Sequence, residues 1–260
     1  MTYKQNRSHR PWKIVAGCCC IQGSVLGLLV NCRGLFFEPV CADLGFNIGG
    51  FTAYGLFYGL ACVIAIPTAA KVLERYDLRV TLTLSSVFMA LVQALFGSFT
   101  RQWHWYAAAA LQGMASAFLF SLTTPLLINN WFTQKRGMML AITGMSSGAV
   151  AAIMNPIGSM VIEQLGWRAG YRFFGLLFLL MTLPATIFWL RLRPKTAEPP
   201  SGGSRLSGFQ GNVWRTIRQP GFLLLIVITG VANLLTCYSQ MLSSYGAAIG
   251  LTASACAMLL

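Results

Sequence analysis

Long apolar runs divide this chain, and short polar or charged segments separate them. Seven runs hold 18 or more residues, and a helix needs about 20 apolar residues to cross a hydrocarbon core of ~30 Å. An eighth run begins at Leu251 and reaches Leu260. The pattern therefore predicts seven transmembrane helices and the start of an eighth. The seven runs are Ile14–Phe37, Gly50–Ala70, Val80–Phe99, Trp105–Ile128, Met138–Ile162, Phe173–Leu190 and Phe222–Tyr245.

These runs lack the strict alternation of barrel strands, and open strands cannot span lipid. We therefore predict an all-α polytopic membrane protein. Composition agrees: 56% of residues are hydrophobic and only 10% are charged, against about 25% charged in ordinary globular chains. A soluble enzyme, a disordered chain and a disulfide scaffold are excluded. The eight cysteines show no Cys-x-x-Cys spacing and only two histidines accompany them, so we predict no metal site.

The basic residues are distributed unequally between the two sides of the predicted membrane. Fifteen of the nineteen lie on the side of the N-terminus, three lie on the other side, and Arg33 falls inside the first run. Because cytoplasmic loops are enriched in Lys and Arg, we predict a multi-pass protein with a cytoplasmic N-terminus. The net charge of +13 is then a topology signal, and we expect the lipid bilayer, not nucleic acid, as the partner of these residues.

A polar segment rich in Pro, Gly and Ser follows the sixth run, a composition typical of a flexible linker. Arginine and proline come just before both the first run, at Pro11, and the seventh, at Pro220. This recurrence favours two parallel repeats joined by a basic loop, with the second repeat breaking off in its second helix. The predicted units are a six-helix half at 1–190, a cytoplasmic linker at 191–220, and the first helix and a stub of a second half at 221–260.

The segment after the second run reads Ala-Lys-Val-Leu-Glu-Arg-Tyr-Asp-Leu-Arg, residues 70–79. It resembles the loop signature of the major facilitator superfamily, with Glu74 in place of an aspartate, Arg75 and Arg79 matching basic positions, and Ala70 and Asp77 in place of two glycines. An acid and an arginine at a helix end can latch neighbouring helices and release them as they rock. We predict a gating role for Glu74, Arg75 and Arg79. The alternative is an ordinary positively charged loop.

Small residues recur every three or four positions on one face of the fifth run, at Gly144, Gly148, Ala152, Asn155 and Ser159. Small residues let a neighbouring helix approach closely, and Pro156 removes a backbone hydrogen bond and bends the helix. The stretch resembles the family's glycine- and proline-rich fifth helix, which packs against helix eight. The resemblance implies conformational roles for Gly144, Gly148, Asn155 and Pro156. A generic small-residue contact is the alternative.

Two further segments narrow the resemblance to one branch. Residues 130–137 read Asn-Trp-Phe-Thr-Gln-Lys-Arg-Gly, and residues 163–169 read Glu-Gln-Leu-Gly-Trp-Arg-Ala. Both resemble signatures of the monocarboxylate porters and oxalate:formate antiporters, the second as the turn before helix six. This implies a major facilitator-type helical bundle in the plasma membrane that carries small organic anions.

Arg33 is the strongest candidate for a substrate contact. A charge at mid-bilayer costs about 2.5–3.5 kcal/mol on insertion scales, so it usually faces a cavity or a partner. Its guanidinium could bind a carboxylate through paired hydrogen bonds, and helix one lines the cavity in carriers that this chain resembles. The alternative is that Arg33 snorkels to the outer interface. The other predicted substrate contacts are Asn31, Tyr58, Gln112, Asn233 and Tyr238, although a helix-to-helix hydrogen bond is the commoner role for any one buried amide.

We therefore predict a secondary transporter that moves a small mono- or dicarboxylate by alternating access, without a cofactor. Anion exchange and proton co-transport both stay open. A membrane enzyme is disfavoured because no run presents paired acids, a histidine cluster or a nucleophile with its base. The remaining rivals are a transporter of another small solute, a receptor, and a truncated membrane protein that does not transport. We expect residues 1–260 alone to insert without transporting, unless two copies complete each other.

Overall fold

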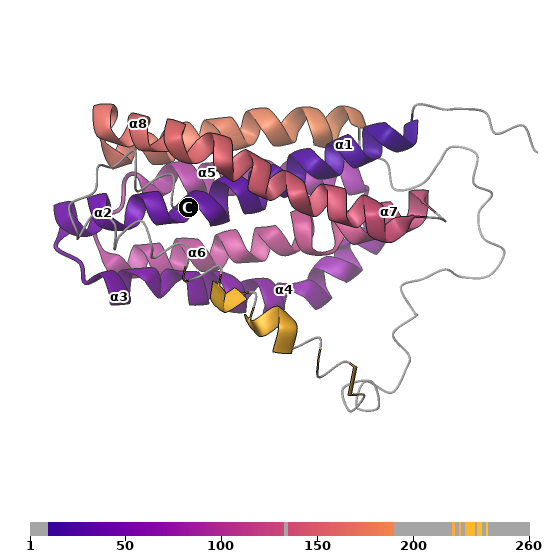
Figure 1. Cartoon of the computed structure of the whole chain (residues 1–260), viewed down its shortest axis with the longest axis horizontal. Coiled ribbons are helices and arrows are strands. Elements are labelled where there is room, and N and C mark those ends of the chain that lie inside the picture. Colours follow the sequence, from indigo (N-terminus) through magenta and orange to yellow (C-terminus); the bar gives the residue numbers. More distant parts are fainter. Residues whose placement is uncertain are drawn as a thin grey trace, which may run out of the picture.

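The structure is a computed structural model, and it describes residues 10–132, 135–189, 220, 221, 224, 227–231, 233–235 and 238. Up to residue 189 its elements are helical, and the long ones run along the long axis of one bundle (Figure 1). The predicted all-α fold is confirmed for this part of the chain. The elements are α1 Arg10–Gln22, η1 Gly23–Val30, η2 Asn31–Phe36, α2 Phe37–Leu44, α3 Ile48–Thr52, α4 Tyr54–Arg75, α5 Leu78–Phe96, α6 Gln102–Ser116, η3 Ala117–Ser121, α7 Thr123–Trp131, α8 Arg136–Pro184 and η4 Ala185–Trp189.

Five helical stretches among the described residues are long and apolar enough to cross a membrane. The last of them, Arg136–Ile187, has 52 residues, about twice what one crossing needs. It bends back at Gly166, whose φ of 82° and ψ of 162° are not helical. Glycine has no Cβ to clash at such a positive φ. Residues 136–187 are therefore two crossings, which gives the six that the sequence predicts for residues 14–190.

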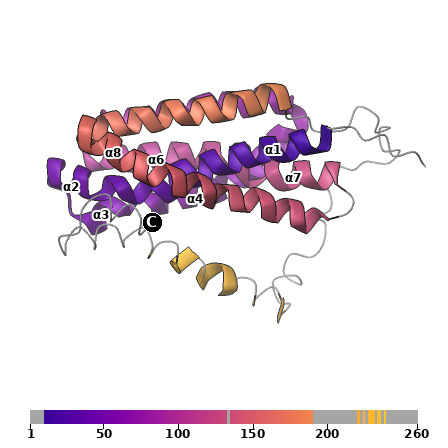
Figure 2. The same ribbon diagram turned by 45° about the horizontal axis from the view of Figure 1, so that its top comes forward.

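The predicted boundaries shift where polar residues prolong a helix. The first span extends to Leu44 and not Phe37, and the sixth begins directly after Gly166 and not at Phe173. Apolar runs mark only the lipid-facing length of a helix, whereas the backbone continues until another group satisfies its hydrogen bonds. Both views show the two arms of α8 meeting at one end and diverging, with α1 between their far ends (Figures 1 and 2).

The first span is packed most closely against the fifth. A Cβ placed on Gly23 would lie 2.8 Å from a methyl carbon of Val150, and one on Gly27 would lie 2.8 Å from the backbone oxygen of Ser147. Glycines four residues apart allow such an approach between membrane helices. The first span accordingly lies at the centre of the bundle, where most of its side chains are buried.

The loop between α4 and α5 is a tight turn of two extended residues, Tyr76 and Asp77. The Asp77 carboxylate accepts a hydrogen bond from the backbone N–H of Arg79 at 3.1 Å and so caps α5. An aspartate cap thus forms the turn where the family's signature has a glycine. The predicted linker up to residue 219, most of the seventh run and residues 251–260 lie outside the described residues.

Candidate functional site

The first span departs from α-helical geometry around Arg33. After α1 it continues as a π-helical segment, η1, and then as a 3-10 segment, η2, which contains Arg33, before α2 resumes the α-helix. Local changes of helical type within a membrane helix are frequent at functional positions. The half-buried Arg33 side chain is therefore carried by an irregular segment inside the predicted bilayer.

Two tyrosines of α4 hold the Arg33 guanidinium. Its Cζ lies 4.8 Å from the centre of the Tyr54 ring and 5.1 Å from that of Tyr58. Gly55 lies between these tyrosines, and a Cβ placed there would be 3.3 Å from an Arg33 Nη atom. Each cation–π contact stabilises the cation by about 0.5–2 kcal/mol, depending on how dry the site is. The rings position the charge without neutralising it.

Arg33 forms no ion pair and no hydrogen bond with any of the described residues, whereas Arg168 is paired with Asp43. A guanidinium carries five N–H donors in a planar fork that suits carboxylate and phosphate groups. An intramembrane charge usually faces a cavity or a partner. Here the structure places the Arg33 guanidinium against the rings of Tyr54 and Tyr58 of α4.

An aromatic cluster supports Tyr54 from behind. Its ring centre lies 5.2 Å from that of Phe51, 6.1 Å from that of Phe96 and 6.2 Å from that of Trp105. Tyr54 and Trp105 are buried. Rings from the second, third and fourth spans therefore fix one wall of the Arg33 site. Tyr58 is predicted from the sequence, but the cluster behind Tyr54 is not. Aromatic residues near the outer ends of several runs are the available signal for it.

The far end of the first span is bonded to the first residues of the sixth. The Asp43 carboxylate is 2.7 Å from a terminal nitrogen of Arg168 and accepts a hydrogen bond from the Trp167 indole at 3.1 Å. The Arg168 guanidinium also lies 4.2 Å from the Trp167 ring centre. The Gly-Trp-Arg segment at 166–168, which resembles a signature of the monocarboxylate porters, therefore joins the sixth span to the first. Its partner Asp43 was not singled out from the sequence.

Gln112 is placed differently from Arg33. Its side-chain amide donates a 2.9 Å hydrogen bond to the side-chain oxygen of Gln93, and the two residues are 1% and 4% exposed. The pair joins α6 to α5 inside the bundle. This arrangement is the helix-to-helix bond that competes with the predicted substrate contact, and we leave Gln112 out of the site proposed below.

The other predicted substrate contacts surround Arg33 only in part. Tyr58 forms its wall, and Asn31 is half-buried two residues before it in η2. In the partly described seventh run, Asn233 donates to the backbone oxygen of Thr229 at 2.8 Å, and Tyr238 is exposed. Neither of these two forms a hydrogen bond or a ring contact with Arg33 among the described residues.

The predicted conformational residues have different surroundings in the structure. Arg75 is exposed in the last turn of α4, while the Glu74 side chain lies outside the described part of the structure. Gly144 and Gly148 have no described atom within 4 Å of an added Cβ. Asn155 is 2% exposed, and its side-chain oxygen has no hydrogen-bond partner among the described residues. Pro156 lies inside α8. The non-helical backbone angles within α8 are at Gly166 and not at Pro156.

Comparison with known proteins places the chain among membrane transporters. The family model described as Major Facilitator Superfamily matches residues 19–260. The chain is 23% identical over 233 residues to "Monocarboxylate transporter 4" of Rattus norvegicus, which covers 85% of this chain and 47% of that protein. It is 32% identical over 143 residues to "Putative glycerol-3-phosphate transporter 2" of Arabidopsis thaliana, covering 51% of this chain and 27% of that protein.

A solved structure shares the fold at low identity. It is a bacterial homologue of the human lysosomal transporter Spinster in an inward-facing, unoccupied conformation, with a TM-score of 0.60 and 14% identity. The match covers 99% of this chain and 59% of that one. The chain thus spans about half or less of the length of the two curated relatives. The resemblance of the loop and helix-five motifs to the major facilitator superfamily is confirmed by the family model, and the solved structure shares the fold.

Proposed function

This chain belongs to the major facilitator superfamily, and on that premise we propose that it works as a secondary transporter of small organic anions by alternating access. The observation that carries the proposal is the Arg33 guanidinium, half-buried between two tyrosine rings and without a counter-ion among the described residues. In a transporter, an intramembrane cation of this kind marks the substrate path. Transport, and not an enzymatic reaction, is the activity we propose.

The site we propose holds one carboxylate at Arg33. Two parallel N–H···O bonds from the guanidinium would bind it, Tyr58 and Tyr54 would orient the guanidinium, and Asn31 would offer an amide on the same segment. Asn233 and Tyr238 are proposed as contacts from the second half, which would close over the site. The described residues do not select a coupling mechanism, and proton co-transport and anion exchange both remain within the proposal.

The names of the relatives support an anionic substrate and offer two chemistries. One relative is named for monocarboxylates and the other for glycerol 3-phosphate. A guanidinium binds carboxylate and phosphate groups with the same planar fork. We propose a mono- or dicarboxylate as the substrate because the relative that covers more of this chain is named for monocarboxylates. An organic phosphate is the second candidate.

The conformational change would use the turn between α4 and α5 and the arm of α8 that precedes Gly166. We propose that Glu74, Arg75 and Arg79 close the cytoplasmic side, with the N-terminus in the cytoplasm and the protein in the plasma membrane. The open surface at Gly144 and Gly148, with Asn155 and Pro156 further along the helix, would receive a helix of the second half. Rocking of two halves about a midplane site is the usual form of alternating access.

Uptake measurements test the function directly. Vesicles from cells that express the protein would be supplied with labelled monocarboxylates, dicarboxylates, glycerol 3-phosphate and neutral analogues of the same size. We expect saturable uptake of a carboxylate, inhibited by unlabelled carboxylates and not by the neutral analogues. Uptake of the phosphate alone would favour the second candidate. Saturable uptake restricted to neutral solutes would refute an anion site at Arg33.

A further inference from the structure

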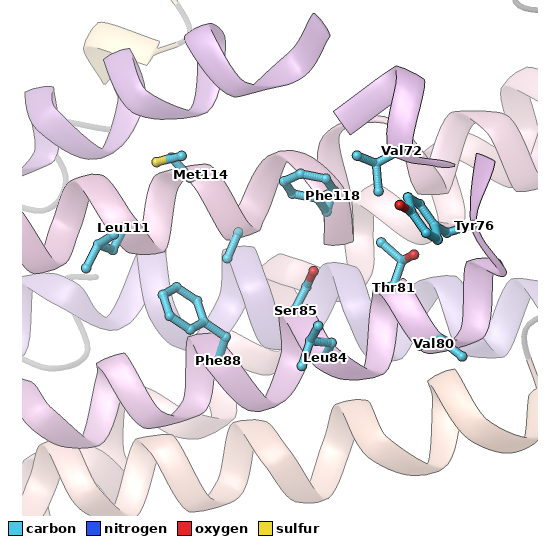
Figure 3. Close-up of a pocket in the computed structure, with 11 residues that line it drawn as sticks. Val72, Tyr76, Val80, Thr81, Leu84, Ser85, Phe88, Leu111, Met114 and Phe118 are labelled. Atoms are coloured by element: carbon cyan, nitrogen blue, oxygen red, sulfur yellow. The ribbon is translucent and has the colours of Figure 1, made fainter. Parts of the chain in front are cut away.

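A deep apolar groove lies on the surface between α4, α5 and α6, away from Arg33 (Figure 3). Its volume is about 610 Å³, within the range of small-molecule sites. Side chains from all three helices and from η3 point into it in Figure 3. The lining residues are Val72, Tyr76, Val80, Thr81, Leu84, Ser85, Phe88, Leu111, Met114, Ala115 and Phe118.

The groove exists because α4 and α5, although joined by a short turn, pack mainly on other elements. Small side chains hold α4 against η3: Ala65 and Ala69 meet Ala117 in a separate buried cluster. α5 packs mainly on α8 and α6. The two helices therefore diverge from their turn, and α6 forms the floor between them.

The groove has a mostly apolar lining, which suits a hydrocarbon ligand. The Thr81 hydroxyl donates to the backbone oxygen of Asp77 at 3.1 Å, so its proton is not available to a ligand. Leu84, which is 70% exposed, and Val80 leave the groove open to the lipid side. Water does not settle in apolar cavities, and an empty groove of this size would forfeit dispersion contacts along its walls.

The length of the groove matches one leaflet. Along α5 it runs from Val80 to Phe88, a rise of about 12 Å at 1.5 Å per residue. Half of the hydrocarbon core measures about 15 Å. An acyl chain that enters at the α4–α5 turn would therefore lie in the groove for most of its leaflet.

Positive charge surrounds the entrance. Lys71, Arg75 and Arg79 each directly precede a lining residue in the sequence, namely Val72, Tyr76 and Val80. Tyr76 is exposed at the end of α4. Tyrosine side chains at the end of a membrane span favour the headgroup region. Glu74 shares the turn, and the other acid, Asp77, is engaged in capping α5. Basic residues next to a membrane span attract lipid phosphates.

We propose that this groove binds one glycerophospholipid of the leaflet that faces the α4–α5 turn. One acyl chain lies between α4 and α5 on the floor of α6, and the phosphate contacts Arg75 and Lys71. The site is separate from Arg33 and does not depend on the proposed substrate. A lipid in this position would brace the turn that carries the predicted gating residues.

Photolabelling tests the acyl-chain part. The purified protein would be placed in phosphatidylcholine vesicles that contain a phospholipid with a diazirine midway along one chain, and adducts would be mapped by mass spectrometry. We expect adducts concentrated on residues 80–88 and 111–118. Leu84→Trp should fill the groove and lower that labelling about tenfold. Leu91→Trp, at a 58% exposed position of α5 outside the groove, should leave it unchanged.

Labelling spread evenly over all exposed apolar positions, or equal labelling of Leu84→Trp and the parent, would overturn the proposal. A cross-link between two copies through the groove would show that a second chain occupies it, with the same consequence. Because the assay needs no transport, its failure is distinguishable from a failure of the anion carrier hypothesis.

Native mass spectrometry tests the headgroup part. We expect the parent protein to retain one phospholipid after detergent exchange from phosphatidylglycerol vesicles, and Lys71→Gln with Arg75→Gln to lose it. Lys13→Gln, an exposed charge on the same side, is the matched control and should retain the lipid. If the double variant keeps the lipid as firmly as the control, the phosphate is not held by these two residues and that assignment fails.

Discussion

Arg33 and the Gln93–Gln112 pair are both polar groups inside membrane-spanning helices, yet they have opposite surroundings. The Gln112 amide donates a hydrogen bond of 2.9 Å to the Gln93 oxygen, and both residues are almost fully buried. Arg33 is half-buried, is flanked by ring faces, and has no acid or hydrogen-bond acceptor among the described residues. The amide pair is joined by a hydrogen bond within the protein, whereas the guanidinium donates no hydrogen bond to the described residues. A polar residue in a membrane helix therefore points to function when its bonding is incomplete, not merely when it is buried.

Giving Arg33 an internal partner should have a large effect on transport. Tyr58→Glu places a carboxylate near the guanidinium, where the two would form an ion pair in low dielectric. Arg33 would then resemble the closed amide pair, and we expect carboxylate uptake to fall at least about tenfold. Tyr58→Phe keeps the ring and should change the apparent KM by less than about threefold. Labelled uptake by vesicles with matched amounts of protein measures both.

Normal uptake by Tyr58→Glu would show that the substrate does not compete for this face of Arg33. A loss of uptake in Tyr58→Phe equal to that in Tyr58→Glu would assign the effect to the hydroxyl and not to the introduced charge. Either result would contradict the proposed difference between Arg33, as a cation that awaits a ligand, and the Gln93–Gln112 pair.

A smaller effect, on stability and not on transport, should follow at the amide pair. Gln112→Leu leaves the buried Gln93 oxygen without a donor, which costs about 1–3 kcal/mol. Gln93→Leu combined with Gln112→Leu removes both polar groups and should recover most of that loss. Thermal unfolding in detergent measures the stability, and uptake kinetics should show an unchanged KM in each variant. An altered KM at unchanged stability would restore Gln112 as a substrate contact.

The sequence identifies Arg33 because a lone charge in an apolar run is visible without any partner. It likewise predicts the six crossings, since apolar length reports directly on local structure, and the family resemblance implies the turn before the sixth span. The sequence does not show whether Gln112 faces a cavity or another helix, because a glutamine in an apolar run gives the same pattern in both cases. The choice is made by the tertiary packing of α5 on α6.

Long-range pairings account for the rest of what the sequence left open. Asp43 meets Arg168 across more than one hundred residues, and no local pattern links the two. Gly23 and Gly27, which follow the small-xxx-small pattern, are among the glycines that bring spans together. The sequence analysis followed that pattern in the fifth run, at Gly144 and Gly148, and not in the first. Which of several such pairs makes a contact depends on how the helices are arranged.

The central claim is that Arg33 binds the anionic group of the substrate, and charge removal at that position tests it most directly. Arg33→Gln, Arg33→Lys and the control Arg101→Gln, an exposed charge in the loop before α6, would be compared for carboxylate uptake at equal membrane expression. We expect Arg33→Gln to lose about 2–5 kcal/mol of substrate binding, at least about a thirtyfold loss of uptake at low substrate. Arg33→Lys should retain part of the activity, because an ammonium keeps the charge but not the paired geometry. Uptake by Arg33→Gln equal to that of Arg101→Gln and the parent would contradict the account.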